Sequence, residues 1–367
     1  MKSPQIKPLT SLRGIAAWGI VFYHFYNYFP ERLSGSSASI AISHMNIAVD
    51  LFFIMSGFVI SLNYSELFAN LSAKNFKEFA IARLSRVYPL HFFMLLLFCG
   101  YASSIYLISK SPFSTEDYGA NYLVLSFLML QNWGFTDHLA WNVPSWSIST
   151  EFACYILFPF ASNGLKRTVR TRTATLAVAA VVIAAIGFVF WRFNADSIGD
   201  QIPKLGLFRC VAEFAIGMLL QQLILLFRVP TMPEQLIAIS VAVITITVGY
   251  LFHWKDYMFI PAAFTAFIFA LLCDGGFVTR ALSHPWLVFL GDISYSTYLC
   301  HYLIKRIVVL MVRDPHHVGV SPLLVYVAAV LVSSILLYRC VERPSRTFIR
   351  SIAHGAKPWR LGKMEGA

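Results

Sequence analysis

The sequence has few charged residues and no polar stretch long enough to fold as a separate soluble domain. Charged residues make up 13% of the 367 residues, whereas hydrophobic residues make up 57%. A typical soluble domain is about one quarter charged. A water-soluble core could not bury so much apolar side chain, so the composition excludes a soluble globular protein and predicts one integral membrane domain.

Several sequence motifs are also missing. The six cysteines show neither CxxC nor the Cys/His spacing of a zinc site, so we expect reduced packing residues and no metal. The formal net charge of +11 comes without a basic-aromatic motif for nucleic acid, and it fits membrane orientation and anionic lipid instead. No small-residue cleavage site follows the polar amino terminus, so the first apolar stretch is expected to remain in the mature protein.

Long apolar runs follow one another along almost the whole chain. A membrane-spanning helix needs about 20 such residues, so we predict an all-α, multi-pass protein with about ten transmembrane helices. The predicted spans are residues 11–29, 46–63, 87–108, 145–161, 174–193, 205–227, 236–253, 257–273, 286–311 and 323–341. Segment 121–130 is apolar but short, and it is predicted to be a re-entrant or interfacial piece.

Lysine and arginine concentrate in alternate loops, as they do on the cytoplasmic side of membrane proteins. The basic segments are 2–7, 74–86, 166–172 and 343–363. With ten spans they all face one side, so both termini are predicted to be cytoplasmic. If segment 121–130 were an eleventh span, the third cluster would lie outside. We therefore predict a transmembrane domain over residues 1–344 and a short basic cytoplasmic tail over 345–367.

The first span contains two ionisable residues, Arg13 and His24. Such groups are costly inside a membrane and usually face the interior of a helix bundle. They are eleven residues apart, which on a helix gives about 16 Å of rise and nearly the same face. An anionic molecule could be held at Arg13 and react at His24. A snorkelling arginine and a hydrogen-bonded bundle histidine explain the same two residues without any function.

Arg83 and Arg86 follow the second span and lie three residues apart, on one face of a helix. Two neighbouring guanidinium groups suit a phosphate ligand. Positive charge that only orients the protein in the membrane is the alternative.

Polar stripes also mark the fourth and ninth spans. Ser147, Glu151 and Tyr155 follow each other at intervals of four residues, with Trp146 beside them, and Ser294, Tyr298, His301 and Lys305 share one face. Asp50, near the start of the second span, is a candidate partner for a buried cation. Arg209 and Glu213, four residues apart, are predicted to form an ion pair. Together the stripes predict a water-filled cavity inside the bundle.

Short motifs occur in order along the chain: LRGIAAWGIVFYH (12–24), VDLFFIMSGF (49–58), RLSRVYP (83–89), WSISTEF (146–152), GDISYSTYLCH (291–301) and VERP (341–344). With ten predicted spans they resemble the acyltransferase-3 family of bacterial membrane acyltransferases. That family transfers acyl groups, most often acetyl from acetyl-CoA, to sugars of surface or secreted glycans. The resemblance implies a multi-pass protein of the bacterial inner membrane whose partners are acyl-CoA, a glycan or lipid-linked sugar acceptor, and membrane lipid.

The resemblance also implies roles for individual residues. His24 matches the catalytic histidine and Arg13 the arginine of the family's R-x10-H motif, while Arg83 and Arg86 match its RxxR motif, which is assigned to the CoA donor. His24 would act as a general base or as a nucleophile, and Glu151 or Asp50 would orient it.

The expected contacts to the acceptor sugar come from the polar stripes: Trp146, Ser147, Tyr298 and His301. The acceptor sugar, the acyl chain length and the oligomeric state stay open. A multi-pass transporter of a small polar solute is the alternative function, although the sequence contains no inverted repeat that would favour it.

Overall fold

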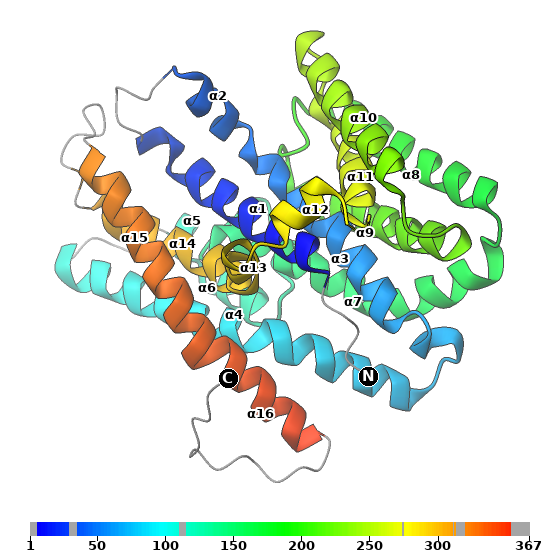
Figure 1. Ribbon diagram of the computed structural model, residues 1–367. Coiled ribbons are helices and arrows are strands. Elements are labelled where there is room, and N and C mark those ends of the chain that lie inside the picture. Colours follow the sequence, from blue (N-terminus) through cyan, green and yellow to red (C-terminus); the bar gives the residue numbers. More distant parts are fainter. Residues whose placement is uncertain are drawn as a thin grey trace.

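In a computed structural model, the chain is described for residues 6–28, 35–109, 115–273, 275–310, 312 and 320–353. All regular structure within these residues is helical, which confirms the predicted all-α class (Figure 1). The longer helices are α1 (Lys7–Phe25), α3 (Ala48–Tyr64), α4 (Ala73–Ser109), α7 (Trp146–Thr168), α8 (Arg172–Arg192), α9 (Ile202–Leu226), α10 (Met232–Leu251), α11 (Ile260–Leu271), α14 (Ser294–Val309), α15 (Val320–Leu337) and α16 (Arg343–Ala353). The shorter ones are α2 (Ser37–Ser43), α5 (Thr115–Tyr118), α6 (Ala120–Phe127), α12 (Phe277–Leu282) and α13 (Pro285–Asp292).

Six helical segments of the described chain are long and apolar enough to cross a membrane, and they indicate a multi-pass membrane protein. They are Met45–Tyr64, Ala73–Ile108, Arg172–Arg192, Ile202–Leu226, Met232–Leu251 and Val320–Ala353. The other four predicted spans correspond to α1, α7, α11 and α13 with α14. Inward polar residues lower the hydropathy of α1, α7 and α14, and α11 has only 12 residues. The count of ten and the orientation remain predictions.

Two predicted segments differ in detail from the observed helices, and a third is as short as predicted. The expected continuous span at 286–311 is wrong, because α13 ends at Asp292 and α14 begins at Ser294. Residues 73–86 are not a loop, since they form the first part of α4, which has 37 residues. Segment 121–130 contains the eight-residue helix α6, which is too short to cross a bilayer. Of the predicted tail, residues up to 353 extend α16, and the rest lies outside the described residues.

Local capping chemistry explains where some helices begin. The Thr171 hydroxyl accepts a hydrogen bond from the backbone N–H of Ala174 at 3.2 Å and starts α8. At the start of α10 the Glu234 carboxylate accepts a hydrogen bond from the backbone N–H of Thr231 at 2.7 Å.

Glycines allow a close contact between α3 and α9. Gly57 of α3 faces the backbone oxygen of Phe214 in α9, and Gly217 of α9 faces the backbone oxygen of Ile54 in α3. A β-carbon at either glycine would collide with that backbone. This small-residue packing is typical of helices inside membranes, where close backbone approach provides much of the attraction.

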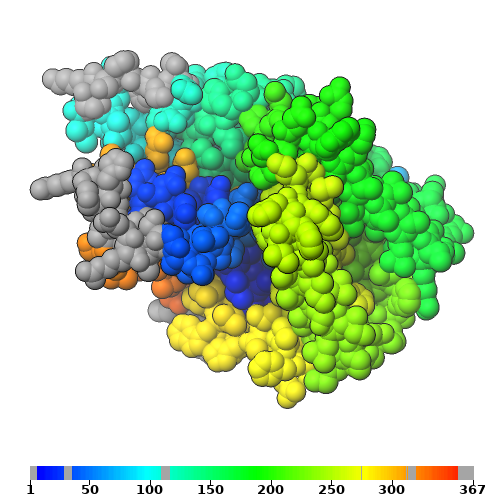
Figure 2. Space-filling view, turned by 90° about the horizontal axis from the view of Figure 1, so that it is seen from above, coloured from blue at the N-terminus to red at the C-terminus, as the bar shows by residue number. Residues whose placement is uncertain are grey.

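Helix α1 lies in the middle of the bundle and packs against α3, α13 and α14 (Figure 1). In Figure 2 the blue residues of α1 and α2 lie between yellow-green α10 and the yellow residues of α12 and α13. A methyl group on Gly14 would lie only 2.6 Å from the backbone nitrogen of Gly291, so α1 and α13 touch through backbone. This contact places Arg13, the neighbour of Gly14, beside Ser294 at the start of α14.

Candidate active site

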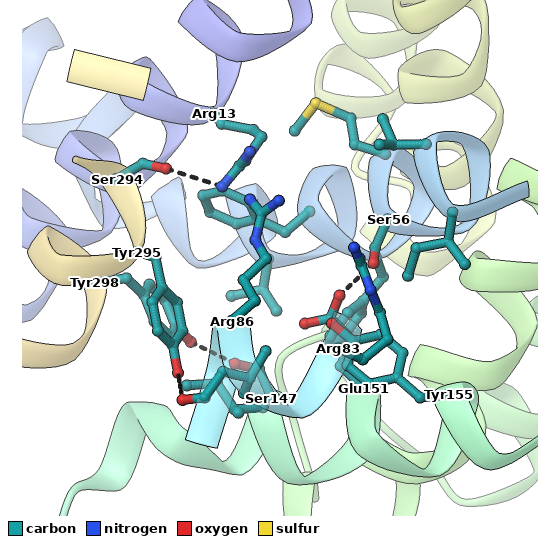
Figure 3. A pocket seen from close by; sticks show the side chains of 18 residues that line it. Arg13, Ser56, Arg83, Arg86, Ser147, Glu151, Tyr155, Ser294, Tyr295 and Tyr298 are labelled. Carbon is teal, nitrogen blue, oxygen red and sulfur yellow. Dashed lines mark hydrogen bonds between the residues drawn. The ribbon is translucent and has the colours of Figure 1, made fainter. Parts of the chain in front are cut away.

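A cavity of about 130 Å³ opens between α1, α3, α4, α7 and α14 (Figure 3). The sequence-predicted residues that line it are Arg13, Arg83, Arg86, Ser147, Glu151 and Tyr298. These residues come from four helices and from four separate sequence motifs. The prediction of an inward polar cavity is therefore confirmed for this part of the bundle.

The three arginines of the cavity are held in different ways. The Arg13 Nη2 donates to Ser294 Oγ at 3.3 Å. The Arg83 guanidinium lies over the Tyr64 ring, 5.1 Å from its centroid, and donates weakly to the Tyr64 hydroxyl at 3.4 Å. Arg86 lines the cavity without a hydrogen bond or ion pair to any described residue, and Figure 3 shows its guanidinium pointing between the other groups.

Among the described residues, Glu151 is the only carboxylate that lines this cavity. It accepts a hydrogen bond from Ser56, a residue that sequence reasoning did not single out. One carboxylate cannot neutralise three guanidinium groups. Glu342 and Asp292 lie near Arg13 outside the lining and partly offset this charge, but Arg346 adds a fourth guanidinium group close to Arg83 and Arg86. The cavity therefore carries an excess of positive charge in a partly desolvated place, where an anionic ligand would be strongly favoured.

Hydroxyl groups form the wall of the cavity opposite Glu151. The Ser147 and Tyr298 hydroxyls lie 2.8 Å apart, and Tyr298 also donates to the backbone oxygen of Pro144 at 2.9 Å. The Tyr295 hydroxyl, which the sequence analysis missed, donates to the backbone oxygen of Val87 at 2.7 Å. These bonds join α14 to α4 and α7 and fix the shape of the wall.

His24 does not line the cavity, but lies further along α1 and contacts His301 directly. Its Nδ1 is 3.1 Å from His301 Nε2 and 3.1 Å from the backbone oxygen of Ile20. Tyr298 connects this pair to the cavity, since its ring centroid is 5.9 Å from that of His301. The sequence marked both histidines as inward-facing, yet it did not predict that they touch.

Asp50 and Trp146 also lie away from the cavity. Both oxygens of Asp50 accept hydrogen bonds from Arg209, each at 2.6 Å, with side chains only 0% and 2% exposed. The expectation that Asp50 neutralises a buried cation is confirmed, and the predicted Arg209–Glu213 ion pair is wrong. Trp146 packs on the same pair, with the Arg209 guanidinium 5.6 Å from its ring centroid.

Neither Asp50 nor Glu151 hydrogen-bonds to His24, so the structure brings neither of the two expected carboxylates to that histidine. A further basic residue comes from α16, which packs on α4. It places Arg346 close enough to Arg83 and Arg86 for their charges to repel.

In the part of the chain that the structure describes, no cluster of three or more His, Cys, Asp or Glu side chains could hold a metal ion.

Comparison with known proteins identifies the family to which the chain is similar. The acyltransferase-3 family profile, described as an acyltransferase domain, matches residues 7–339. Acyltransferase MdmB of Streptomyces mycarofaciens is 26% identical over 319 residues, which cover 82% of this chain and 79% of MdmB. The O-acetyltransferase OatA of Staphylococcus aureus is 25% identical over 374 residues, which cover 94% of this chain but 58% of OatA. No solved structure matches significantly.

Proposed function

Since the chain belongs to the acyltransferase-3 family of membrane acyltransferases, we propose that it transfers an acetyl group from acetyl-CoA to a sugar hydroxyl. The acceptor is a sugar of a surface or secreted glycan, free or lipid-linked, and the enzyme works in the inner membrane of a bacterium. The similarity to the acyltransferase MdmB and to the O-acetyltransferase OatA, together with the cavity described above, supports this choice over transport of a solute.

The observation that carries the proposal is the excess of guanidinium groups in the cavity. CoA is an anion with several phosphate oxygens, and guanidinium groups bind such oxygens in pairs of hydrogen bonds. Arg86 has every donor free for such a ligand among the described residues, and Arg13 and Arg83 lie on either side of it. Arg346 on α16 adds charge near the same arginines and would favour entry of the donor.

The distance between the arginines and the histidine also suits CoA. Arg13 and His24 are eleven residues apart on α1, so about 16 Å of helix rise separates them. The pantetheine arm of CoA is a long flexible chain that ends in the thioester. With its phosphates at the arginines, the arm would run past Tyr298 and bring the thioester towards the His24–His301 pair.

His24 is proposed as the general base of the reaction. Its neutral imidazole takes the proton of the sugar hydroxyl while the hydroxyl oxygen attacks the thioester carbonyl carbon. The new C–O ester bond forms, the C–S bond breaks, and the leaving thiolate recovers the proton as free CoA. In the alternative route, His24 itself attacks the carbonyl, a C–N bond forms as the C–S bond breaks, and CoA leaves as the thiolate. The sugar hydroxyl then attacks the acetyl group on the ring, the C–N bond breaks, and the hydroxyl proton passes to the CoA thiolate.

The test uses purified protein in lipid nanodiscs with radiolabelled acetyl-CoA and a panel of glycans. We expect label to move to a glycan, and replacing Arg86 with Gln to weaken donor binding roughly 10- to 150-fold, as expected for loss of a charged hydrogen bond. The exposed Arg170 provides the matched control, because Arg170→Gln removes the same charge far from the cavity. Equal donor affinity in the two variants, or no label on any acceptor, would overturn the proposal.

A further inference from the structure

Two backbone carbonyl groups determine where the protons of the His24–His301 pair sit. A carbonyl oxygen can only accept a hydrogen bond, so a ring nitrogen that faces one must carry a proton. His24 Nδ1 faces the Ile20 oxygen at 3.1 Å, and His301 Nδ1 faces the Thr297 oxygen at 3.3 Å. In the neutral pair both protons therefore lie on the Nδ1 atoms.

This arrangement leaves only one consistent pattern for the two remaining nitrogens. A neutral imidazole has a single N–H, so His301 Nε2 has a bare lone pair, and the one Nδ1–H of His24 is shared between this lone pair at 3.1 Å and the Ile20 oxygen as a bifurcated hydrogen bond. The Nε2 atom of His24 then also has a bare lone pair. It makes no hydrogen bond to any described residue, and His24 is half-buried, whereas His301 is 0% exposed.

We propose that His301 is a positioning residue that fixes the tautomer and orientation of His24 and leaves His24 Nε2 free as the proton acceptor. The inference rests on the proposed function, in which His24 is the general base. It replaces the carboxylate that the sequence analysis expected beside His24, and it explains why both nitrogens of His301 are occupied and only one of His24 is.

The same contact would help during the reaction. When His24 Nε2 takes the proton of the acceptor hydroxyl, the ring becomes an imidazolium, and its Nδ1–H bond to His301 becomes charge-assisted and stronger. A buried aspartate has this function in serine hydrolases. Here the neutral imidazole of His301 would orient and stabilise the His24 ring without placing a further charge inside the membrane.

The experiment compares two variants of His301. Leucine has similar bulk but cannot accept a hydrogen bond, whereas the side-chain oxygen of glutamine can take the place of Nε2. We expect His301→Leu to lower kcat for acetyl transfer roughly 10- to 100-fold, by analogy with the loss of the hydrogen-bond partner of a metal-bound histidine. The KM for acetyl-CoA should stay within about twofold, and His301→Gln should recover most of the rate.

His91 is the matched control, because it is another buried histidine. Its Nε2 lies 2.8 Å from the backbone oxygen of Ser126. His91→Leu should leave kcat near the wild-type value. Thermal stability and acetyl-CoA binding are measured for every variant, so that loss of folding is separated from loss of rate. Nitrogen-15 NMR of histidine-labelled protein, with His24 assigned by its loss in His24→Ala, should find the His24 proton on Nδ1.

The outcomes separate this inference from the proposed function. The positioning role of His301 is wrong if His24→Ala abolishes transfer but His301→Leu keeps the wild-type kcat. It is also wrong if His301→Gln is as slow as His301→Leu while both are folded. In either case the assignment of His24 as the general base is unaffected. A proton on His24 Nε2 in the NMR spectrum would also overturn it. If His24→Ala transfers acetyl normally, the general base itself is wrong, and the role of His301 is lost with it.

Discussion

Replacing Asp50 with Asn removes the carboxylate that neutralises Arg209 in the interior of the bundle. Arginine does not lose its proton in proteins, so the variant would leave the Arg209 charge without its hydrogen-bonded carboxylate at a site only 2% exposed. Loss of one partner of such a pair costs roughly 3–5 kcal/mol. At roughly 2 °C per kcal/mol for a large chain, the apparent Tm should fall by about 6–10 °C.

Two further variants make this prediction specific. Glu213 is equally buried and one helical turn from Arg209, but its oxygens accept no hydrogen bond from the described residues. Glu213→Gln should therefore cost less than about 1 kcal/mol. The double variant Asp50→Leu with Arg209→Met exchanges the ion pair for apolar side chains of similar size, and it should recover most of the lost stability.

The assay is thermal unfolding of detergent-purified protein, followed by fluorescence-detected gel filtration, together with acetyl transfer by each variant. The structure predicts that the double variant folds and transfers acetyl, because Asp50 does not touch the cavity or His24. If that variant were stable but inactive, Asp50 would have the catalytic role that the sequence suggested. If Asp50→Asn and Glu213→Gln lowered Tm equally, the reasoning from the ion pair would be refuted.

Two other predictions come from the structure and a third from the charges of the loops. Arg86→Lys keeps the charge but not the paired donors, so the Kd for acetyl-CoA should rise several-fold in a binding assay, and an unchanged Kd would assign Arg86 to membrane orientation alone. Gly57→Ala should destabilise by roughly 1–3 kcal/mol because its methyl group meets the backbone of α9, whereas Gly100→Ala, which has nothing within 4 Å, should keep the wild-type Tm. Reporter fusions should place residue 168 in the cytoplasm and residue 116 outside, and the opposite result for residue 168 would contradict the ten-span topology.

The sequence predicted the residues that face inward but not how the helices meet. Periodicity marks Ser147, Glu151 and Tyr155 as one face of a helix, and in the structure all of them line the cavity. The structure also places Arg13 of α1 in the same cavity as Arg83 and Arg86 of α4. Such patterns are local, because the 3.6-residue period of a helix depends only on the residues of that helix.

Contacts between distant segments could not be read in the same way. His24 and His301 are 277 residues apart, and Asp50 and Arg209 are 159 residues apart. Which pairs meet depends on the depth and rotation of each helix, and glycine contacts such as that of Gly14 with Gly291 decide these. The four-residue spacing therefore predicted an ion pair between Arg209 and Glu213, whereas the observed partner of Arg209 is Asp50 on another helix.

The most direct test of the account is acetyl transfer by the His24→Ala variant, measured beside its affinity for acetyl-CoA. Loss of a general base should lower kcat by roughly two to four orders of magnitude, while the Kd for acetyl-CoA stays near the wild-type value because the arginines of the cavity are untouched. Near-normal transfer by His24→Ala, with the activity lost instead in His301→Gln, would contradict the assignment of His24 as the base.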